Sequence, residues 1–211
     1  NAVKWKKTVI WRKRMDLYMI RHGESLANFT GTHAGWAPVP LTEKGEAQAE
    51  AARRHVRNLT FDRLYVSDVR RAQQTADILF PGVPRTFSTI IREINNTSMR
   101  GKTCDDMTAL YGERYLACRK NFDYAPLGID CESGAHMRAR AQEFLDLVAA
   151  EETLTRVAAV AHAGFITAMA EVVLGARVGR QMSCGNASVS IFRYENTRWR
   201  LRLWNLTPDM D

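Results

Sequence analysis

The stretch that indicates the fold is Leu17-Tyr18-Met19-Ile20-Arg21-His22-Gly23-Glu24-Ser25, in which a short apolar run leads directly into a histidine and a glycine. The fully apolar residues 157–161 lead in the same way into His162 and Gly164. A run without a polar face predicts a strand that is covered on both sides, in the centre of a sheet. Ligands of open α/β sheets lie at the carboxyl ends of the strands. We therefore expect two parallel strands that bring His22 and His162 to one site.

Strand and helix patterns alternate along the rest of the chain, which predicts an α/β domain with a mostly parallel sheet. Thr42 can cap one helix, and Pro81-Gly82 ends another. Further strands are expected at 63–66 and 86–90, followed by a closing hairpin of 187–194 and 199–204. Helices are expected at 42–56, 69–79, 103–120, 134–150 and 165–174.

The length of 211 residues fits one domain, and the net charge of +7 is unevenly distributed. Residues 1–14 hold six basic side chains and no acidic one, so the rest of the chain carries only about +1. We expect 1–14 to be a basic leader or upstream extension and 15–211 to be a single domain. A nucleic-acid or membrane partner is not expected, although an anion- or membrane-attracting role of the leader is the alternative. No apolar run approaches the ~18 residues that cross a bilayer.

The four cysteines show no Cys-x-x-Cys pair and no zinc-like spacing. Free thiols in a reducing cytoplasm are therefore expected. Cys184 lies beside Gly185 in an expected loop, and we expect it to be the most exposed of the four. No metal-ligand cluster is apparent, and the expected chemistry needs neither a metal nor another cofactor.

The residues near the two strand ends suit the chemistry of a phosphate group. A planar guanidinium binds phosphate oxygens bidentately, which predicts that role for Arg21 and Arg71. His22 can attack phosphorus only as a neutral imidazole, and nearby arginines keep it neutral by lowering its pKa. His162 would stabilise the phosphoryl oxygens. Glu93 would give the leaving alcohol a proton and then take one from water.

The position of Glu93 after the expected strand at 86–90 leaves room for other carboxylic acids. Asp105, Asp106 and Glu113 follow within the next twenty residues and are the alternatives for the proton donor. His33 lies in a loop near the expected site and is a further candidate for substrate contact, whereas His55 and His136 are expected on the surface.

Several motifs occur in one order along the chain, and together they resemble the histidine phosphatase superfamily, in its phosphoglycerate-mutase-like branch. The resemblance covers nearly all of the chain from Met15 onward. The motifs are Arg-His-Gly-Glu-Ser at 21–25, Asn28, Gly35-Trp36, Leu-Thr-x-x-Gly at 41–45 with Gln48-Ala49, Ser-Asp-x-x-Arg-Ala-x-x-Thr-Ala at 67–76, Glu93, Glu132-Ser133 with Arg140, and His162.

The resemblance implies a three-layer αβα sandwich and a phosphohistidine intermediate on His22. It assigns the phosphate contact to Arg71 rather than Arg70 and the acid/base role to Glu93. It also places Asn28, Gly35 and the N–H of Ala163 at the substrate. The implied substrate is a small phosphorylated molecule. The resemblance leaves open whether the protein is a monomer or a homodimer.

The segment 94–133 departs from relatives that carry Gly-x-Trp-Glu-Gly after the glutamate, because only Gly101 fits that pattern here. The segment is expected to be irregular and to shape the substrate pocket, so the substrate stays unassigned. Mutases of the family carry Glu-Arg-His-Tyr-Gly where this chain has Glu93-Ile94-Asn95-Asn96-Thr97. Hydrolysis of a phosphomonoester is therefore favoured. Phosphoglycerate mutase-type transfer and a catalytically silent phosphate-binding domain are the alternatives.

Overall fold

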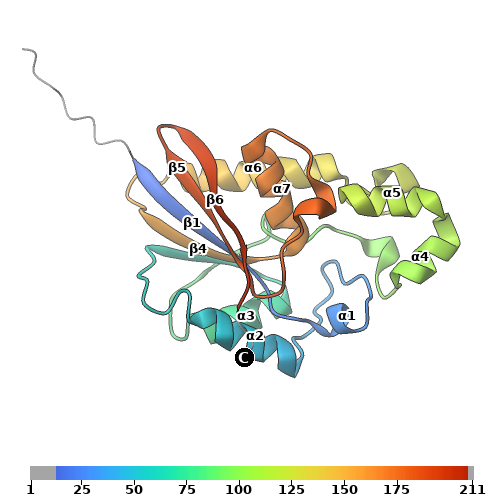
Figure 1. Cartoon of the computed structure of the whole chain (residues 1–211), viewed down its shortest axis with the longest axis horizontal. Helices are drawn as coiled ribbons and strands as arrows, with labels where there is room; N and C mark the ends of the chain where they lie inside the picture. Colours follow the sequence, from blue (N-terminus) through green and yellow to red (C-terminus); the bar gives the residue numbers. More distant parts are fainter. Residues whose placement is uncertain (1–12, 209–211) are drawn as a thin grey trace, which may run out of the picture.

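Six strands form one sheet in the order β3-β2-β4-β1-β5-β6 in the computed structural model, which describes residues 13–208 (Figure 1). The first four strands of that order pair in parallel, and the last two pairings are antiparallel. The mostly parallel sheet is thus confirmed, with β4 in its interior. The strands are β1 (Arg14–Arg21), β2 (Arg63–Ser67), β3 (Thr86–Ser88), β4 (Arg156–Ala161), β5 (Val189–Glu195) and β6 (Arg198–Leu206).

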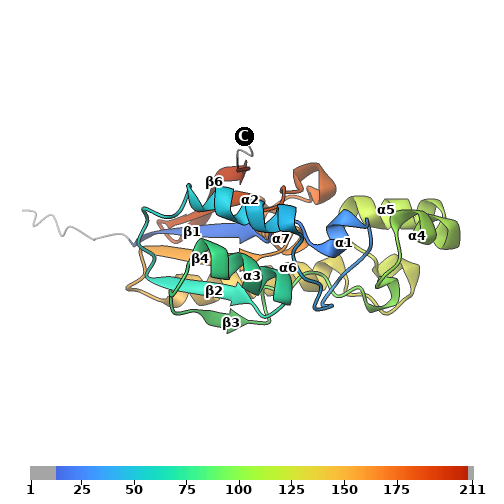
Figure 2. The same cartoon turned by 90° about the horizontal axis from the view of Figure 1, so that it is seen from below.

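Helices cover both faces of the sheet, which confirms the three-layer αβα sandwich (Figures 1 and 2). Helices α2 (Glu43–Arg53) and α3 (Arg70–Leu79) lie on one face, and α6 (Gly134–Ala150) and α7 (Ala163–Leu174) lie on the other. The remaining short helices lie beyond the end of the sheet to which β1 and β4 point, or in the connections. They are α1 (Leu26–Phe29), α4 (Cys104–Tyr111), α5 (Glu113–Asn121) and the 3₁₀ turns η1 (Thr97–Met99), η2 (Ala125–Leu127) and η3 (Gly179–Met182).

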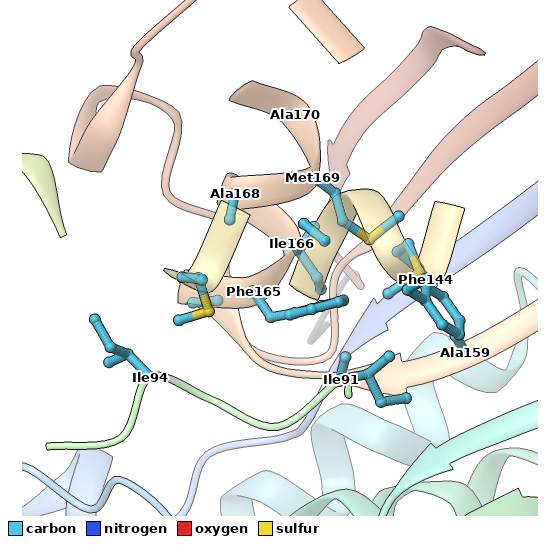
Figure 3. Packing of buried hydrophobic residues seen from close by; sticks show 14 of the residues in the cluster. Ile91, Ile94, Phe144, Ala159, Phe165, Ile166, Ala168, Met169 and Ala170 are labelled. Atoms are coloured by element: carbon cyan, nitrogen blue, oxygen red, sulfur yellow. The ribbon is translucent and has the colours of Figure 1, made fainter. Parts of the chain in front are cut away.

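The apolar strands separate two hydrophobic cores. Leu17 and Met19 of β1 pack into the larger core beside α6 and α7, whereas Ile20 packs into the smaller core beside α2 and α3. Phe144 and Phe165 meet edge to face in the larger core, with ring centroids 6.1 Å apart (Figure 3). Truncating such a buried phenylalanine costs about 3–5 kcal/mol, so this packing holds α6 and α7 firmly on the sheet.

Capping and turn residues account for most of the element boundaries. The Oγ1 of Thr42 accepts a hydrogen bond from the Gly45 N–H at 3.0 Å and caps α2, as expected. The hairpin between β5 and β6 turns at Asn196 and Thr197, which both have positive φ, as a type I′ turn requires. Helix α7 begins two residues earlier than expected, because His162 is already its N-cap.

Three further expectations about the elements are wrong in detail. The expected helix 103–120 is two helices, α4 and α5, because Gly112 has a φ of +56° and a ψ of −140° that break it. The expected helix 42–56 ends at Arg53 and the expected strand 86–90 ends at Ser88. The four-residue helix α1 was missed, because it is too short to show a periodic pattern.

The exposure of the thiols also differs from expectation. All four cysteines are free, and Cys184 is only 2% exposed rather than the most exposed of them. Its carbonyl accepts a 2.6 Å hydrogen bond from Arg21, so the loop that carries it is drawn against the end of β1. Cys104 and Cys131 are the more accessible thiols.

Residues 1–12 of the expected leader lie outside the described residues. Arg14 already belongs to β1 and pairs with Glu195, so the strand starts before the expected domain boundary at Met15. Lys13 donates hydrogen bonds to the carbonyls of Ala149 and Glu151, both at 2.6 Å. Within residues 13–208, no helix combines the length and apolarity that a membrane span requires.

Candidate active site

The parallel pairing of β1 and β4 brings the two histidines together. Arg21 pairs with Ala161 in register, and the His22 N–H donates to the Ala161 carbonyl at 3.0 Å. The imidazole rings of His22 and His162 lie with their centroids 5.1 Å apart, and both are buried. The parallel register of β1 and β4 thus holds two residues that are 140 positions apart in the sequence at the carboxyl ends of adjacent strands.

The hydrogen bonds of His22 determine which of its ring nitrogens is reactive. Its Nδ1 lies 2.7 Å from the carbonyl oxygen of Gly23, which can only accept, so Nδ1 carries the proton. The lone pair of Nε2 accepts a hydrogen bond from Nε of Arg71 at 3.0 Å. Nε2 is therefore the candidate nucleophilic atom, and its lone pair is occupied by the hydrogen bond from Arg71.

Both histidines are held neutral. Burial lowers the pKa of His22 well below its ordinary value, and the positive charges of Arg71 and Arg21 lower it further. Burial also lowers the pKa of His162 well below its ordinary value, with Arg71 as the next cause. At neutral pH His22 therefore has the uncharged form that attack on phosphorus requires.

Arg71, in the first turn of α3, connects the two imidazoles. Its Nη2 donates to the Gly35 carbonyl at 2.9 Å and lies 3.1 Å from Nδ1 of His162. The opposite nitrogen of that ring, Nε2, lies 2.9 Å from the hydroxyl of Ser67. Burial lowers the pKa of Arg71 to about 10, which keeps it charged at neutral pH.

The start of α3 is also tied to the loop that carries His22. The hydroxyl of Thr75 donates to the Arg71 carbonyl at 2.7 Å and accepts the Gly23 N–H at 3.1 Å. One side chain therefore links the backbone beside the nucleophile to the backbone of the phosphate-binding arginine. These two hydrogen bonds give the threonine of the 67–76 motif a role in positioning Gly23 and Arg71.

Arg21, the last residue of β1, directly precedes His22. Its Nη1 donates to the Cys184 carbonyl at 2.6 Å, and its Nε is buried without a hydrogen-bond partner. A buried donor without an acceptor is costly, on the order of 1–3 kcal/mol. Because Arg21 lines the cavity, a bound phosphate oxygen is an acceptor that could relieve this cost.

Glu93 is held at the site by backbone donors. Its two carboxylate oxygens accept the N–H groups of Ile94 at 2.9 Å and Gly164 at 3.2 Å. A Cβ on Gly164 would lie only 2.3 Å from Glu93 Oε1, so the glycine is required for this approach. The Glu93 carbonyl in turn accepts from Trp36 Nε1 at 2.7 Å and from Arg140 at 3.4 Å.

These groups surround a cavity of about 310 Å³. Glu93 is the one acidic side chain in its lining within residues 13–208, and the alternatives Asp105, Asp106 and Glu113 lie outside it. His162 is not exposed to the cavity and lies behind Arg71. The other expected residues reach the lining, which comprises Arg21, His22, Ser25, Ala27, Asn28, Thr32, His33, Ala34, Gly35, Arg71, Glu93, Ile94, Asn96, Phe122, Tyr124, Ala163, Arg180 and Ser183.

The three expected substrate contacts differ in their surroundings. Asn28 Oδ1 accepts from the Ser25 N–H at 3.1 Å and from Asn186 at 3.2 Å, which leaves the Asn28 amide N–H groups for a ligand. Gly35 has a φ of +50°, and its carbonyl is bound by Arg71. Ala163 is the first residue of α7, where helix N–H groups lack intrahelical acceptors.

The sequence did not indicate Phe122, Tyr124, Asn186 or Arg180 as residues of the site. Phe122 and Tyr124 follow α5, and Arg180 lies in η3, in segments without periodicity or motif. Their approach to His22 depends on how α5 and η3 pack beyond the sheet. The only sequence signal was indirect, since the segment 94–133 was expected to shape the pocket.

Comparison with known proteins gives matches over nearly the whole chain. Residues 17–207 match the histidine phosphatase superfamily (branch 1). The chain is 29% identical over 187 residues to an adenosylcobalamin/alpha-ribazole phosphatase of Salmonella typhimurium, with 88% of each protein covered. It is 36% identical over 118 residues to a 2,3-bisphosphoglycerate-dependent phosphoglycerate mutase of Corynebacterium kroppenstedtii, covering 52% of this chain and 48% of that protein.

Solved structures are similar as well. A mycobacterial glucosyl-3-phosphoglycerate phosphatase in complex with VO3 superposes with a TM-score of 0.80 at 31% identity, covering 92% of this chain and all of that one (100%).

Proposed function

Because this chain belongs to the histidine phosphatase superfamily (branch 1), we propose that it hydrolyses a small phosphomonoester through a phosphohistidine formed on His22. The resemblance in its motifs is confirmed by the match over residues 17–207. One observation carries the proposal. A neutral His22, with Nε2 as its acceptor nitrogen, faces a cavity whose lining includes the guanidinium groups of Arg21 and Arg71 and the carboxyl group of Glu93.

The first contribution to substrate binding is electrostatic. A phosphomonoester carries nearly two negative charges at neutral pH, which Arg21 and Arg71 match. Nε of Arg71 leaves His22 Nε2 and donates to a phosphoryl oxygen instead, so the lone pair of the nucleophile becomes available. The amide of Asn28 and the N–H of Ala163 supply further donors at the start of α1 and α7.

In the first chemical step, the Nε2 lone pair forms a bond to phosphorus and the bond from phosphorus to the ester oxygen breaks. Protonated Glu93 gives its proton to that oxygen, so that an alcohol leaves. The positive charge on the phosphorylated ring is shared with Nδ1–H, which donates to the Gly23 carbonyl. Arg71, backed by neutral His162, stabilises the charge on the phosphoryl oxygens.

In the second step, the Glu93 carboxylate takes a proton from water while the water oxygen bonds to phosphorus. The bond between phosphorus and His22 Nε2 breaks, and inorganic phosphate and neutral His22 result. Glu93 gives up a proton in the first step and regains one in the second, so it ends the cycle as it began. No step of the proposed cycle is routed through a metal or another cofactor.

The mutase alternative deserves the same test, because the chain also matches a phosphoglycerate mutase over about half of its length. A mutase would return the phosphoryl group from His22 to the organic product, whereas a phosphatase releases it to water. A panel of phosphomonoesters that is scored both for inorganic phosphate and for isomerised ester separates the two. We expect phosphate release to dominate.

The role of His22 is tested by replacing it with alanine. We expect His22→Ala to lower kcat/KM by at least about 10⁴-fold, because without the imidazole no covalent intermediate can form. Rapid quenching of the wild-type protein with ³²P-labelled substrate should trap acid-labile, base-stable label on a histidine. His136→Ala, which removes an exposed imidazole outside the cavity, is the matched control. Normal turnover by His22→Ala would overturn the mechanism.

The remaining expectations join this proposal. We propose that residues 15–211 act as one domain and that the segment 94–133 shapes the pocket, which is supported by Asn96, Phe122 and Tyr124 in the cavity lining. A cytoplasmic location is supported by the four free thiols. A small phosphorylated substrate, rather than nucleic acid or a membrane, is the proposed partner, and a monomer or a homodimer would serve equally.

A further inference from the structure

The cavity lining carries one more cation than a phosphate group needs. Within the described residues, its cationic side chains are Arg21, Arg71 and Arg180, and its acidic side chain is Glu93. Arg21 and Arg71 already match the two negative charges of a phosphate group. Arg180 is an additional positive charge in the lining, and its side chain is exposed.

We propose that Arg180 binds a second anionic group of the substrate, so that the preferred substrates are phosphomonoesters that also carry a carboxylate or another phosphate. The inference rests on the proposed phosphatase function and names the substrate class of the same site. Arg21 and Arg71 lie beside His22 and serve the reacting phosphate, whereas Arg180 comes from η3 and serves the remote part of the substrate.

The contacts of Arg180 leave its hydrogen-bond donors available. Its guanidinium carbon lies 4.9 Å from the centroid of the Phe122 ring, and within residues 13–208 no carboxylate lies within salt-bridge distance of it. Stacking on an aromatic face orients a guanidinium while its N–H groups still point outward in the plane. Such a stacked guanidinium is suited to bidentate binding of a carboxylate or phosphate.

The backbone that carries Arg180 is fixed. A single carboxylate oxygen of Glu171, which is buried on α7, accepts the N–H groups of both Val178 and Gly179 at 2.9 Å. Gly179 has a φ of +50°, and a Cβ there would lie only 2.4 Å from the Lys120 carbonyl at the end of α5. The turn before Arg180 is therefore clamped between two helices, which holds its side chain at the cavity.

The charge of Arg180 acts inside the cavity. Burial lowers the pKa of His33 to about 4, and the charge of Arg180 is the next cause. The same charge also lowers the pKa of Arg21, after the larger effect of burial and the opposing effects of Cys184 and Glu93. His33 is consequently neutral, so neither it nor the amide of Asn96 carries a charge that pairs with Arg180. The Arg180 side chain is exposed, so a ligand anion that enters the cavity can reach it.

Neighbouring arginines behave differently and provide controls. Arg114 on α5 lies outside the cavity and donates to the Pro126 carbonyl at 2.8 Å. Arg177 lies three residues before Arg180 but pairs with Glu171 at 3.3 Å. Arg114→Met removes the same charge from the same end of the molecule as Arg180→Met without touching the cavity.

The test compares substrates that differ only in the second anion. 3-Phosphoglycerate has a carboxylate where glycerol 3-phosphate has a hydroxymethyl group, and fructose 1,6-bisphosphate has a second phosphate that fructose 6-phosphate lacks. We expect the wild-type protein to have a higher kcat/KM for the member with the second anionic group in at least one pair. Arg180→Met should reduce the kcat/KM of that member about 10- to 100-fold. It should lower the kcat/KM of the member without the second anionic group by less than about threefold.

Arg180→Lys should recover part of the preference, and Arg114→Met should keep it. The pair that shows the effect tells which anion Arg180 binds. An equal loss on both members of each pair, or a wild-type protein without any preference, would overturn the inference.

A failure of the proposed function gives a different result. A wild-type protein that hydrolyses neither these esters nor p-nitrophenyl phosphate refutes the phosphatase, and calorimetric binding then decides about Arg180. The anion site is supported if 3-phosphoglycerate binds more tightly than glycerol 3-phosphate, or fructose 1,6-bisphosphate more tightly than fructose 6-phosphate, and if Arg180→Met abolishes this difference in affinity. Equal affinities within both pairs refute it.

Discussion

His22 and His162 stay uncharged for one physical reason, because burial beside arginines disfavours a further positive charge. The consequence differs between the two rings. His22 contacts the cavity with its acceptor nitrogen, whereas His162 is enclosed between Ser67 and Arg71. The first can therefore form a bond to phosphorus, and the second acts through the guanidinium that it orients.

The acid/base role of Glu93 is tested by a graded substitution. We expect Glu93→Gln to reduce kcat/KM by about 10²- to 10⁴-fold for an alkyl phosphate, because the departing alcohol needs a proton. The loss for p-nitrophenyl phosphate should be at least tenfold smaller, since its leaving group is stable as an anion. Steady-state kinetics on both substrates measure the difference. Glu113→Gln, on the exposed start of α5, should change neither value.

Equal losses on the two substrates would show that Glu93 holds the loop in place but does not transfer the proton. The carboxylate accepts from Ile94 and Gly164, so a change in both rates by the same factor is the pattern expected of a structural role.

The residues that the sequence indicated are those tied to strand ends and helix starts. His22 and His162 follow apolar runs, and parallel register then requires them to meet. Arg180 and Tyr124 could not be found in this way, because their approach depends on tertiary packing between segments without periodicity. The exposure of Cys184 was misjudged for a related reason, since an adjacent glycine indicates a loop but not what covers the loop.

Helices α4 and α5 extend past the carboxyl ends of the strands (Figure 1), and Phe122 and Tyr124, which follow α5, line the cavity. One helix was expected over residues 103–120, within a segment that is otherwise irregular by pattern. That expectation gave no weight to Gly112, whose conformation of φ +56° and ψ −140° is accessible mainly to glycine. The helical segment was therefore located correctly, but its division at Gly112 was missed.

A matched pair of glycine substitutions tests this division. Gly112→Asn should lower the free energy of unfolding by about 1–3 kcal/mol, because asparagine cannot adopt that conformation without strain. Gly128→Asn should cost less than about 1 kcal/mol, since its left-handed angles of 69° and 27° suit asparagine. Neither position has an atom within 4 Å of the added Cβ. Denaturant unfolding compares the two, and equal costs would assign the break to something other than Gly112.

The whole molecule keeps its site at the boundary between two cores. The larger core anchors α6 and α7, the smaller anchors α2 and α3, and the strands between them end at the cavity. This division of the sheet was predictable from apolar runs and helix spacing, because both depend on local sequence. The position of the α4–α5 pair was not, since the larger core supports it only through contacts distant in sequence.

Acid should destabilise the folded molecule through its buried imidazoles. In the unfolded chain a histidine takes up a proton below about pH 6.5, whereas the lowered pKa values keep folded His22 and His162 neutral. Their contribution to stability is complete above pH 6.5 and is lost as pH falls from there toward the folded pKa values. Near pH 5, each of the two histidines should lower the free energy of unfolding by about 1.4 kcal/mol for every unit by which the pH falls.

Urea unfolding at pH 7, 6 and 5 measures this dependence. His22→Asn should remove about half of the slope that the two histidines contribute, and His136→Asn, at an exposed position, should leave it unchanged. A slope that is the same in His22→Asn as in the wild type would contradict the assignment.

The hydrogen bond from Arg71 to His22 also has a consequence for chemical selectivity. A buried imidazole with a free lone pair would react with any small electrophile that entered the cavity. Here the Nε–H of Arg71 donates a hydrogen bond to that lone pair, and only an anionic ligand that attracts the guanidinium can break this hydrogen bond. A neutral acylating or alkylating reagent offers no such attraction. In the proposed mechanism, the negative charge of the substrate therefore frees the Nε2 lone pair of His22 that attacks it.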